Sequence, residues 1–206
     1  MKVRTPAKRE AIVSAAAELF QELGYERASM NELVKRMGGS KATLYGYFPS
    51  KEDLFAAVVR SIATSDLSNA TIALQQAIQR NANMRDALTQ FGAGLLQVLA
   101  NDRSALAIYR MVMGEAGRSE VGKAFYEAGP AGSLKLLAEL LKVFMDRGEL
   151  READPHVCAL QLTALVTAEV NPRLYQRDPA KVSKANIQRM SEHAVGTFLF
   201  GVAPRN

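Results

Sequence analysis

Apolar residues recur at intervals of three and four along most of this chain, the spacing that places them on one face of an α-helix. The first such segment follows Thr5, a residue type suited to cap a helix, and Pro6, which is favoured at the first helical position. Gly24 ends the segment, as glycine often does after a helix. The apolar residues that share its face are Ile12, Ala16, Leu19, Phe20 and Leu23. We therefore expect the chain to begin with an amphipathic helix.

The segment from residue 29 to residue 51 contains three further helix-start signals. In each of them a serine hydroxyl can accept a hydrogen bond from a backbone amide that has no partner within the helix. The signals are Ser29 with Glu32 three residues later, Ser40 before a short helical run, and Ser50 with Asp53 three residues later. Helices that start this close together must be short and joined by tight turns.

Gly38 and Gly39 mark the turn between the first two of these helices, because glycine reaches backbone conformations that other residues avoid. Pro49 ends the second helix, since it disfavours a helical conformation at Phe48. This leaves a helix of about two turns, Lys41–Tyr47. Two short helices joined by a glycine turn are typical of a helix-turn-helix, which makes double-stranded DNA the expected partner.

Apolar and basic side chains occupy different positions in this segment. A small core can form from Leu33, Val34, Met37, Leu44 and Phe48, which leaves Lys41, Thr43, Tyr45 and Tyr47 to point elsewhere. Between positions 27 and 51 the charge balance is +4, because Arg27, Lys35, Arg36, Lys41 and Lys51 face only Glu32. Such a cluster is either a solvated face or an electrostatic footprint for phosphate, and the adjoining turn favours the second interpretation.

Three stretches follow one another across the helix-turn-helix: Thr43-Leu44-Tyr45, Tyr47-Phe48 and Ser50-Lys51-Glu52-Asp53-Leu54-Phe55. They closely resemble the TetR family of bacterial transcription regulators, and the resemblance covers roughly residues 5 to 62. The C-terminal region is similar to the AefR-like subgroup. The resemblance implies an all-α fold in which a three-helix DNA-binding domain, residues 1–50, is joined to a helical domain for effector binding and dimerisation, residues 51–206.

Carried onto this chain, the DNA contacts of the family fall on the helix-turn-helix and on the next helix start. The residues are Ser29, Ser40, Lys41, Ala42, Thr43, Tyr45, Gly46, Tyr47 and Lys51. The resemblance implies that Ser29 meets the DNA backbone, that Lys51 binds a phosphate, and that the helix between them faces the major groove. Gly46 departs from the family pattern, in which a larger contacting side chain is frequent, so base selection would rest on fewer residues.

The side chains of the second helix have chemistry that suits these roles. Lys41 can donate to guanine acceptors, and Thr43 offers both a hydroxyl and a methyl group. Tyr45 and Tyr47 are better suited to bond phosphates, or to pack on sugars and thymine methyls, than to read one base edge. The alternative for Tyr45 is packing onto its own domain. Gly39 also departs from the family, where an apolar residue is frequent at this turn position, so we expect less local packing.

Nearly every segment after Ser50 is predicted to be helical, because hairpin signals and β-branched alternation are scarce. The expected helices occupy about residues 51–79, 83–100, 103–116, 119–128, 131–147, 155–173 and 180–201. The first of them would link the two domains, with Asp66-Leu67-Ser68-Asn69 as a point of interruption. The chain is therefore expected to be all-helical.

An apolar stripe runs along the middle helices. Six of its residues are candidates for lining an effector pocket: Met84, Leu88, Phe91, Leu95, Tyr109 and Met113. Such stripes usually pack into a core, but the resemblance to regulators that hold a small effector between these helices favours a cavity. Gly92 and Gly94 each weaken a helix by about 1 kcal/mol relative to alanine, so we expect another backbone or a ligand close to them. The expected effector is small and largely apolar.

The last two long helices mix large with small residues in a pattern that favours a dimer interface. The candidates are Leu160, Ala164, Thr167, Ile187, Met190, Ala194 and Phe198, and the alternative is burial within the chain. A short recognition helix touches few base pairs, so helix-turn-helix regulators commonly pair two half-sites across a symmetry axis. We expect a homodimer on a palindromic operator, and by analogy with the family two dimers can share one operator.

Composition limits the remaining classes of protein. A chain of 206 residues with 48% hydrophobic content is expected to fold, and no apolar run approaches the ~20 residues of a membrane span. Met1-Lys2-Val3-Arg4 leads into a charged helix rather than a signal sequence, so a cytoplasmic protein is expected. Cys158 is the sole cysteine, and we expect a small core residue rather than a redox sensor.

Catalysis has little support in the sequence. His156 and His193 lie outside any recognisable nucleophile or zinc motif, and His156 and Cys158 would point to different faces of a helix. No phosphate-binding glycine pattern is present. We therefore expect a ligand-released transcriptional repressor with no enzyme activity, cofactor or metal. The alternative is a helical ligand-binding or scaffolding protein that binds no specific DNA.

Overall fold

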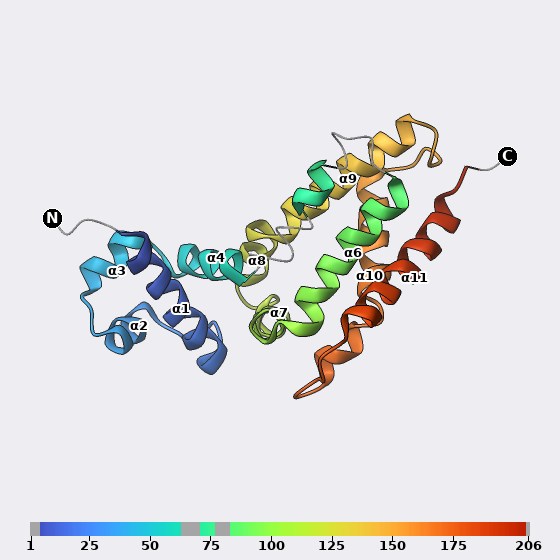
Figure 1. Cartoon of the computed structure of the whole chain (residues 1–206). Helices are drawn as coiled ribbons and strands as arrows, with labels where there is room; N and C mark the ends of the chain where they lie inside the picture. Colours follow the sequence, from blue (N-terminus) through green and yellow to red (C-terminus); the bar gives the residue numbers. More distant parts are fainter. Residues whose placement is uncertain (1–4, 63–70, 77–82, 205–206) are drawn as a thin grey trace. The chain divides into compact units, whose positions relative to one another are not determined.

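The computed structural model describes residues 5–62, 71–76 and 83–204, which form helices joined by turns and loops (Figure 1). These described residues contain no β-strand, so the all-α prediction is confirmed. None of their helices has the length and apolar character needed to cross a membrane. The chain divides into two compact units: unit 1 is Met1–Ile62 with Arg103–Pro130, and unit 2 is Ala63–Asp102 with Ala131–Asn206.

Unit 1 contains α1 (Pro6–Leu23), α2 (Met30–Met37), α3 (Lys41–Tyr47), α4 (Lys51–Ile62), α7 (Arg103–Glu115) and α8 (Val121–Ala128). Its first four helices begin at the predicted caps. The cap hydroxyl accepts a backbone N–H in each case: Thr5 from Lys8 at 3.3 Å, Ser29 from Glu32 at 3.1 Å, Ser40 from Thr43 at 3.1 Å, and Ser50 from Asp53 at 3.0 Å. The sequence therefore determines where each of these helices starts.

The turn between α2 and α3 uses its two glycines differently. Gly38 has a φ of 63°, in the left-handed region, and its N–H bonds to the Lys35 carbonyl. Gly39 lies outside the positive-φ region, and a Cβ added there would meet no atom within 4 Å. Beside it is a small cavity of about 20 Å³, lined in part by Val34 and Met37. The turn thus forms as predicted, and the looser packing expected at Gly39 is present.

Alanine at these two positions is expected to change stability in opposite directions. Gly39→Ala should stabilise the protein by about 0.4–1 kcal/mol, because it restricts the unfolded chain at a position with room for a methyl group. Gly38→Ala should destabilise it by about 1–2 kcal/mol, because its backbone is left-handed. Urea unfolding of both variants would measure this difference. Equal effects at the two sites would contradict the described turn geometry.

The core of unit 1 extends beyond the N-terminal helices. Phe20, Tyr25 and Phe55 form an aromatic cluster with ring centroids 5.1 to 5.7 Å apart. Ile108 and Val112 of α7 are buried in the same core, together with Val121 at the start of α8. Residues 103–130 therefore pack with α1 and α4, although they lie far away in sequence. The functional division into residues 1–50 and 51–206 stays a prediction.

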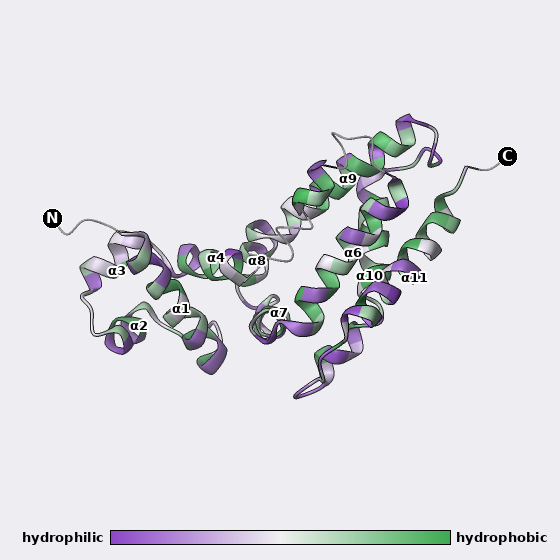
Figure 2. Cartoon of the chain, viewed as in Figure 1, coloured by the Kyte–Doolittle hydropathy of each residue, from purple (hydrophilic) through white to green (hydrophobic). Residues whose placement is uncertain are grey.

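Unit 2 contains a helical segment at residues 71–76, α6 (Met84–Asn101), α9 (Pro130–Asp146), α10 (Pro155–Thr167), the 3-10 helix η1 (Asn171–Tyr175) and α11 (Lys184–Val202). Figure 2 shows hydrophobic residues along α6, α9, α10 and α11, with hydrophilic residues on their other faces. The hydrophobic faces form one core that includes Leu88, Leu141 and Phe144. Cys158 is also buried in this core, and burial raises the pKa of its thiol.

Among the described residues, two helix boundaries differ from the predicted ones by four or more residues. Part of the predicted helix 51–79, including Asp66-Leu67-Ser68-Asn69, lies outside the described residues. The helix predicted for residues 155–173 ends at Thr167 and is followed by η1, because Pro172 disfavours an α-helical conformation at Asn171. The last helix starts at Lys184 rather than residue 180, because the Ser183 hydroxyl accepts the Asn186 N–H at 3.2 Å.

Gly92 allows α6 and α11 to approach closely. A Cβ at this position would overlap the hydroxyl of Ser191 and would lie 3.2 Å from Val166 Cγ2. Ser191 is completely buried, and its hydroxyl donates to the Thr89 carbonyl at 2.7 Å. The predicted close approach at Gly92 is therefore an approach of another helix of the same unit.

Gly92→Ala and Ser191→Ala are expected to be coupled. Alanine at position 92 gains about 1 kcal/mol in helix propensity, but overpacking against Ser191 costs about 1–3 kcal/mol. Removing the hydroxyl with Ser191→Ala relieves that overlap, so the double variant should be more stable than the sum of the single effects by about 1–3 kcal/mol. Chemical denaturation of all four proteins would measure the coupling. Purely additive effects would show that the two helices are not this close.

Candidate nucleic-acid interface

Helix α3 has one buried and one exposed face. Leu44 is buried within unit 1, as is Phe48 directly after the helix. On the other side Lys41 and Ala42 are exposed, and Tyr45 keeps 47% of its surface exposed. The other predicted residues of the helix, Thr43, Gly46 and Tyr47, are half-buried. A partner can thus reach Tyr45. This exposure does not favour the alternative, in which the Tyr45 side chain packs onto its own domain.

Ser40 and Thr43 form a small hydrogen-bonded unit at the start of α3. Besides capping the helix, the Ser40 hydroxyl lies 2.9 Å from the Thr43 hydroxyl, and either group can donate. This contact fixes the Thr43 side chain before any partner binds. The hydroxyl is engaged with Ser40, so the methyl group is the part of Thr43 best placed to distinguish thymine from other bases.

Tyr47 connects the end of α3 to the start of α1. Its hydroxyl accepts the Thr5 N–H at 2.8 Å, so part of its polar capacity is used within the protein. The phenolic hydrogen still leaves one donor for a phosphate oxygen. Tyr47 therefore orients α3 and keeps the capacity for the DNA contact predicted for it.

Lys51 opens α4 and is held by two contacts from the loop between α1 and α2. Its Nζ lies 4.1 Å from the centroid of the Tyr25 ring, and it donates to the Glu26 carbonyl at 3.4 Å. Tyr25 is buried and donates through its hydroxyl to Glu52 Oε1 at 3.2 Å. Burial raises the pKa of Tyr25 well above its usual value, and the neighbouring Glu52 carboxylate acts in the same direction. The sequence pattern alone indicated no role for Tyr25.

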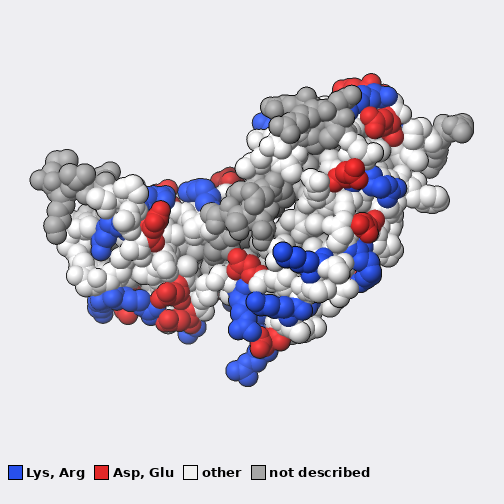
Figure 3. All heavy atoms as spheres, viewed as in Figure 1, with Lys and Arg blue, Asp and Glu red and all other residues white. Residues whose placement is uncertain are grey.

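Several basic side chains of the predicted footprint are already paired. Arg36 donates to both carboxylate oxygens of Glu22, at 3.0 and 2.6 Å, and this hydrogen bonding lowers the pKa of Glu22. Lys35 lies 3.8 Å from Glu32. Lys41 forms no ion pair with any described residue. Figure 3 shows basic and acidic side chains intermixed on the visible surface. Fewer basic side chains are therefore left to bind phosphate than the local charge balance indicates.

The six candidate pocket residues lie in two different units. Leu88 and Phe91 are buried in the core of unit 2, and Leu95 packs against that core. Leu88 and Phe91 thus agree with the alternative that the apolar stripe packs into a core. Tyr109 and Met113 belong to α7 of unit 1, where Tyr109 contacts the Phe125 ring edge-to-face at 5.9 Å. Met113 is 63% exposed. A common pocket for all six stays a prediction.

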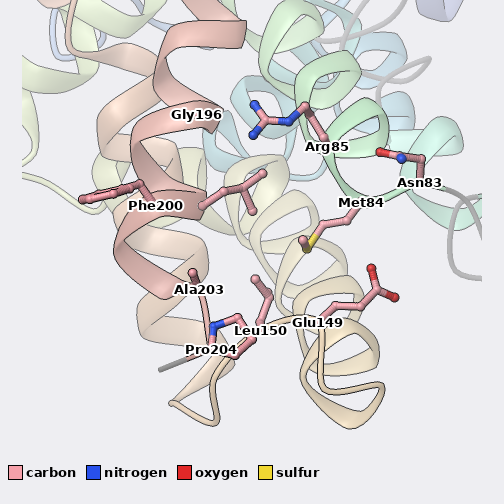
Figure 4. Close-up of a pocket in the computed structure, with 10 residues that line it drawn as sticks. Asn83, Met84, Arg85, Glu149, Leu150, Gly196, Phe200, Ala203 and Pro204 are labelled. Carbon is pink, nitrogen blue, oxygen red and sulfur yellow. The ribbon is translucent and has the colours of Figure 1, made fainter. Parts of the chain in front are cut away.

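Met84 lines an open groove of about 550 Å³ in unit 2 (Figure 4). The groove is formed by the start of α6, the turn after α9 and the end of α11. Its other lining residues are Asn83, Arg85, Glu149, Leu150, Gly196, Leu199, Phe200, Ala203 and Pro204. In Figure 4 the Phe200 ring points away from Met84 and Leu150. Phe200 is 90% exposed, which is unusual for a phenylalanine at the end of a well-packed helix.

The predicted dimer residues divide into two groups. On α10, Leu160 and Ala164 are exposed and Thr167 is half-buried, so this part is available to a partner. On α11 the predicted residues face the core of unit 2, since Ile187, Met190, Ala194 and Phe198 are 3 to 7% exposed, and a role for them in dimerisation stays a prediction. These four residues form the inward stripe of an amphipathic helix. This arrangement agrees with the alternative of burial within the chain.

Phe200 is an exposed aromatic residue of α11 that is absent from the predicted interface residues. It falls outside the inward stripe and lies between the small residues Gly196 and Gly201. An aromatic residue off the apolar stripe of a helix is a signal of an interface, and a helical-wheel comparison of residues 187–202 would have found it.

Comparison with protein-family models agrees with this arrangement. Residues 12–58 match the model described as bacterial regulatory proteins, tetR family. Residues 86–201 match the AefR-like transcriptional repressor C-terminal domain. Together these matches cover both the helix-turn-helix and most of the C-terminal helices.

Solved structures and curated proteins give similar results. A TetR-family regulator from Mesorhizobium loti is 28% identical over 98% of this chain and 100% of that chain, with a TM-score of 0.77. The flavonoid-responsive regulator FrrA is 30% identical over the same shares, with a TM-score of 0.74.

Among curated proteins, the regulator RutR of Escherichia coli is 43% identical over 27% of this chain and 26% of its own length. The A-factor receptor protein of Streptomyces griseus is 28% identical over 76% and 51%. The chain thus spans about a quarter to a half of these curated relatives. Because the AefR-like model alone covers more than half of the chain, the chain belongs to the TetR family of helix-turn-helix transcriptional regulators and has an AefR-like C-terminal domain.

Proposed function

We propose that this TetR-family chain is a repressor that binds a palindromic DNA operator as a homodimer and is released by a small-molecule effector. The observation that carries the proposal is the exposed face of α3, which presents Lys41 and Tyr45 beside the fixed side chain of Thr43. A regulator of this kind acts in the cytoplasm, where its operator is accessible.

Each contact in the interface has its own role in the proposal. Lys41 and Thr43 enter the major groove, where a lysine donates to guanine and a threonine methyl packs on thymine. Tyr45, Tyr47 and Lys51 bind phosphates and fix the register of α3 on the duplex. Ser29 occupies the start of α2, where backbone amides also attract a phosphate.

Dimerisation is proposed to use the outward faces of α10 and α11. A helix of seven residues such as α3 reads only a short half-site, so a second copy is needed for a specific operator. Leu160 of α10 is 47% exposed and Phe200 of α11 is 90% exposed. Small residues on the same helices, such as Ala164 and Gly196, allow close approach of a partner helix. The same surface on both copies gives an isologous, two-fold interface.

Effector release is proposed to act through α7. Ile108 and Val112 bury one face of this helix in the core of unit 1, while Met113 is exposed and Tyr109 is half-buried. A ligand that binds at Tyr109 or Met113 is proposed to displace α7, a helix that packs on α1. To release DNA, the ligand must bind the DNA-incompetent conformation more tightly than the competent one. FrrA is named as flavonoid-responsive, which suggests flat aromatic molecules as first candidates.

A salt-controlled binding assay tests the proposal. Fluorescence anisotropy would compare DNA from immediately upstream of the protein's own gene with a random duplex of equal length, between about 50 and 200 mM salt. The expected result is sequence-specific binding that a flavonoid or another small aromatic molecule reverses. Failure to enrich any sequence from a random library would favour the ligand-binding or scaffolding alternative. Specific binding that no ligand in a broad panel reverses would remove only the effector part.

A further inference from the structure

Lys51 occupies a helix position at which a lysine does not stabilise the helix. It is the first residue of α4, next to the positive end of the helix dipole, where acidic residues such as Glu52 and Asp53 are preferred. The helix is already capped by Ser50, which accepts the Asp53 N–H and donates to Asp53 Oδ2 at 2.8 Å. The lysine must therefore be stabilised by other contacts.

Those contacts come from residues 25 and 26. The Tyr25 ring faces the Lys51 ammonium at 4.1 Å, and the Glu26 carbonyl accepts from it at 3.4 Å. A ring face at this distance attracts a cation without neutralising its charge, unlike a carboxylate. The ammonium thus keeps its charge, and two of its three N–H donors remain for an incoming anion.

The Tyr25 ring is itself held by contacts within the core of unit 1. It is 3% exposed, it contacts Phe55 edge-to-face at 5.1 Å and stacks on Phe20 at 5.7 Å, and its hydroxyl is bonded to Glu52. The ring is therefore a rigid platform that belongs to the core of unit 1, whereas a lysine side chain alone samples many rotamers.

We infer that Tyr25 is a positioning residue for DNA binding, which holds the Lys51 ammonium in place before a phosphate arrives. The inference rests on the proposed DNA-binding function, and it assigns a role to a buried residue that never touches DNA. Ordering the side chain in the free protein removes the entropy loss that binding would otherwise incur, which corresponds to about a 2- to 12-fold gain in affinity for each half-site.

A double-mutant cycle tests the inference. Tyr25→Leu removes the ring face and should weaken DNA binding by about 2- to 12-fold for each half-site. In the Lys51→Ala background the same substitution should have no further effect, because its target is gone. Tyr25→Phe keeps the ring and should restore the affinity that leucine loses. Equal losses from Tyr25→Leu in both backgrounds would show a general structural role and would overturn the inference.

Nuclear magnetic resonance of the DNA-free wild-type protein gives an independent readout. After reductive ¹³C-methylation of lysines, the Lys51 signal, assigned with Lys51→Arg, should be shifted upfield by the ring current of Tyr25. A Lys51 signal at the position of a solvated lysine would overturn the inference even if Tyr25→Leu does not fold. If the wild-type protein shows the ring-current shift but binds no DNA, the proposed function fails instead, because the lysine is held as described without serving a phosphate contact.

Discussion

Phe200→Glu is expected to dissociate the homodimer and, as a consequence, to abolish tight operator binding. An aromatic anchor at the centre of an interface contributes about 2–4 kcal/mol, and a two-fold interface contains it twice, so the dimer should be weakened by roughly 4–8 kcal/mol. Two buried carboxylates without partners add to this loss. Analytical ultracentrifugation would show a monomer at concentrations where the wild-type protein is a dimer.

The variant should lose DNA affinity because its two DNA-binding domains are no longer linked in one dimer. A monomer engages one half-site at a time and gives up the gain of about 10²- to 10⁴-fold that linkage provides. The fold of unit 2 should be unaffected, because Phe200 is 90% exposed and contributes little to its own core. Thermal unfolding of the variant would check this.

Tyr175→Glu provides a matched control. Tyr175 is also an aromatic residue of unit 2 with 90% exposure, but it lies on η1 and not on the outward face of α11. This variant should remain dimeric and should bind the operator as the wild-type protein does. Dissociation by both substitutions would mean that added charge, rather than the loss of the Phe200 contact, is responsible. A dimeric Phe200→Glu protein would exclude Phe200 from the interface.

The sequence predicted the N-terminal helices well because their signals are local. A cap depends on a hydroxyl and an amide three residues away, as in Ser29 and Glu32, and a turn depends on the backbone of a residue such as Gly38. These interactions involve residues within one turn of each other. Their outcome can therefore be derived without knowing the rest of the fold.

Long-range packing could not be derived in the same way. The apolar spacing of Ile187 and Phe198 fits an inward face and an interface equally well, and only the position of α6 against α11 distinguishes them. The burial of Ile108 and Val112 in the core of unit 1 depends on the packing of α7 with α1 and α4, which leaves no local signal in the sequence. The contact between Tyr25 and Lys51 also joins the loop after α1 to the start of α4, which are far apart in sequence.

Thr43→Ala and Tyr45→Ala are each expected to weaken operator binding by about 1–3 kcal/mol for each half-site, and thus by roughly 2–6 kcal/mol for the dimer. Dimerisation should be unchanged, because both residues lie on α3. Tyr126→Ala is a suitable control, since Tyr126 on α8 has 45% exposure against 47% for Tyr45. It should leave DNA binding at the wild-type level.

The two α3 variants should differ in how their losses depend on sequence. Thr43 presents a methyl group to the base edges, so Thr43→Ala should lose affinity for the operator and little for an operator altered at the one contacted base pair. Tyr45 binds phosphate in the proposal, so Tyr45→Ala should weaken both duplexes alike. Measuring each variant on both duplexes separates the roles. If Tyr45→Ala lost affinity only for the unaltered operator, Tyr45 would be the base-reading residue, and the selectivity of this interface would not rest on Thr43 and Lys41.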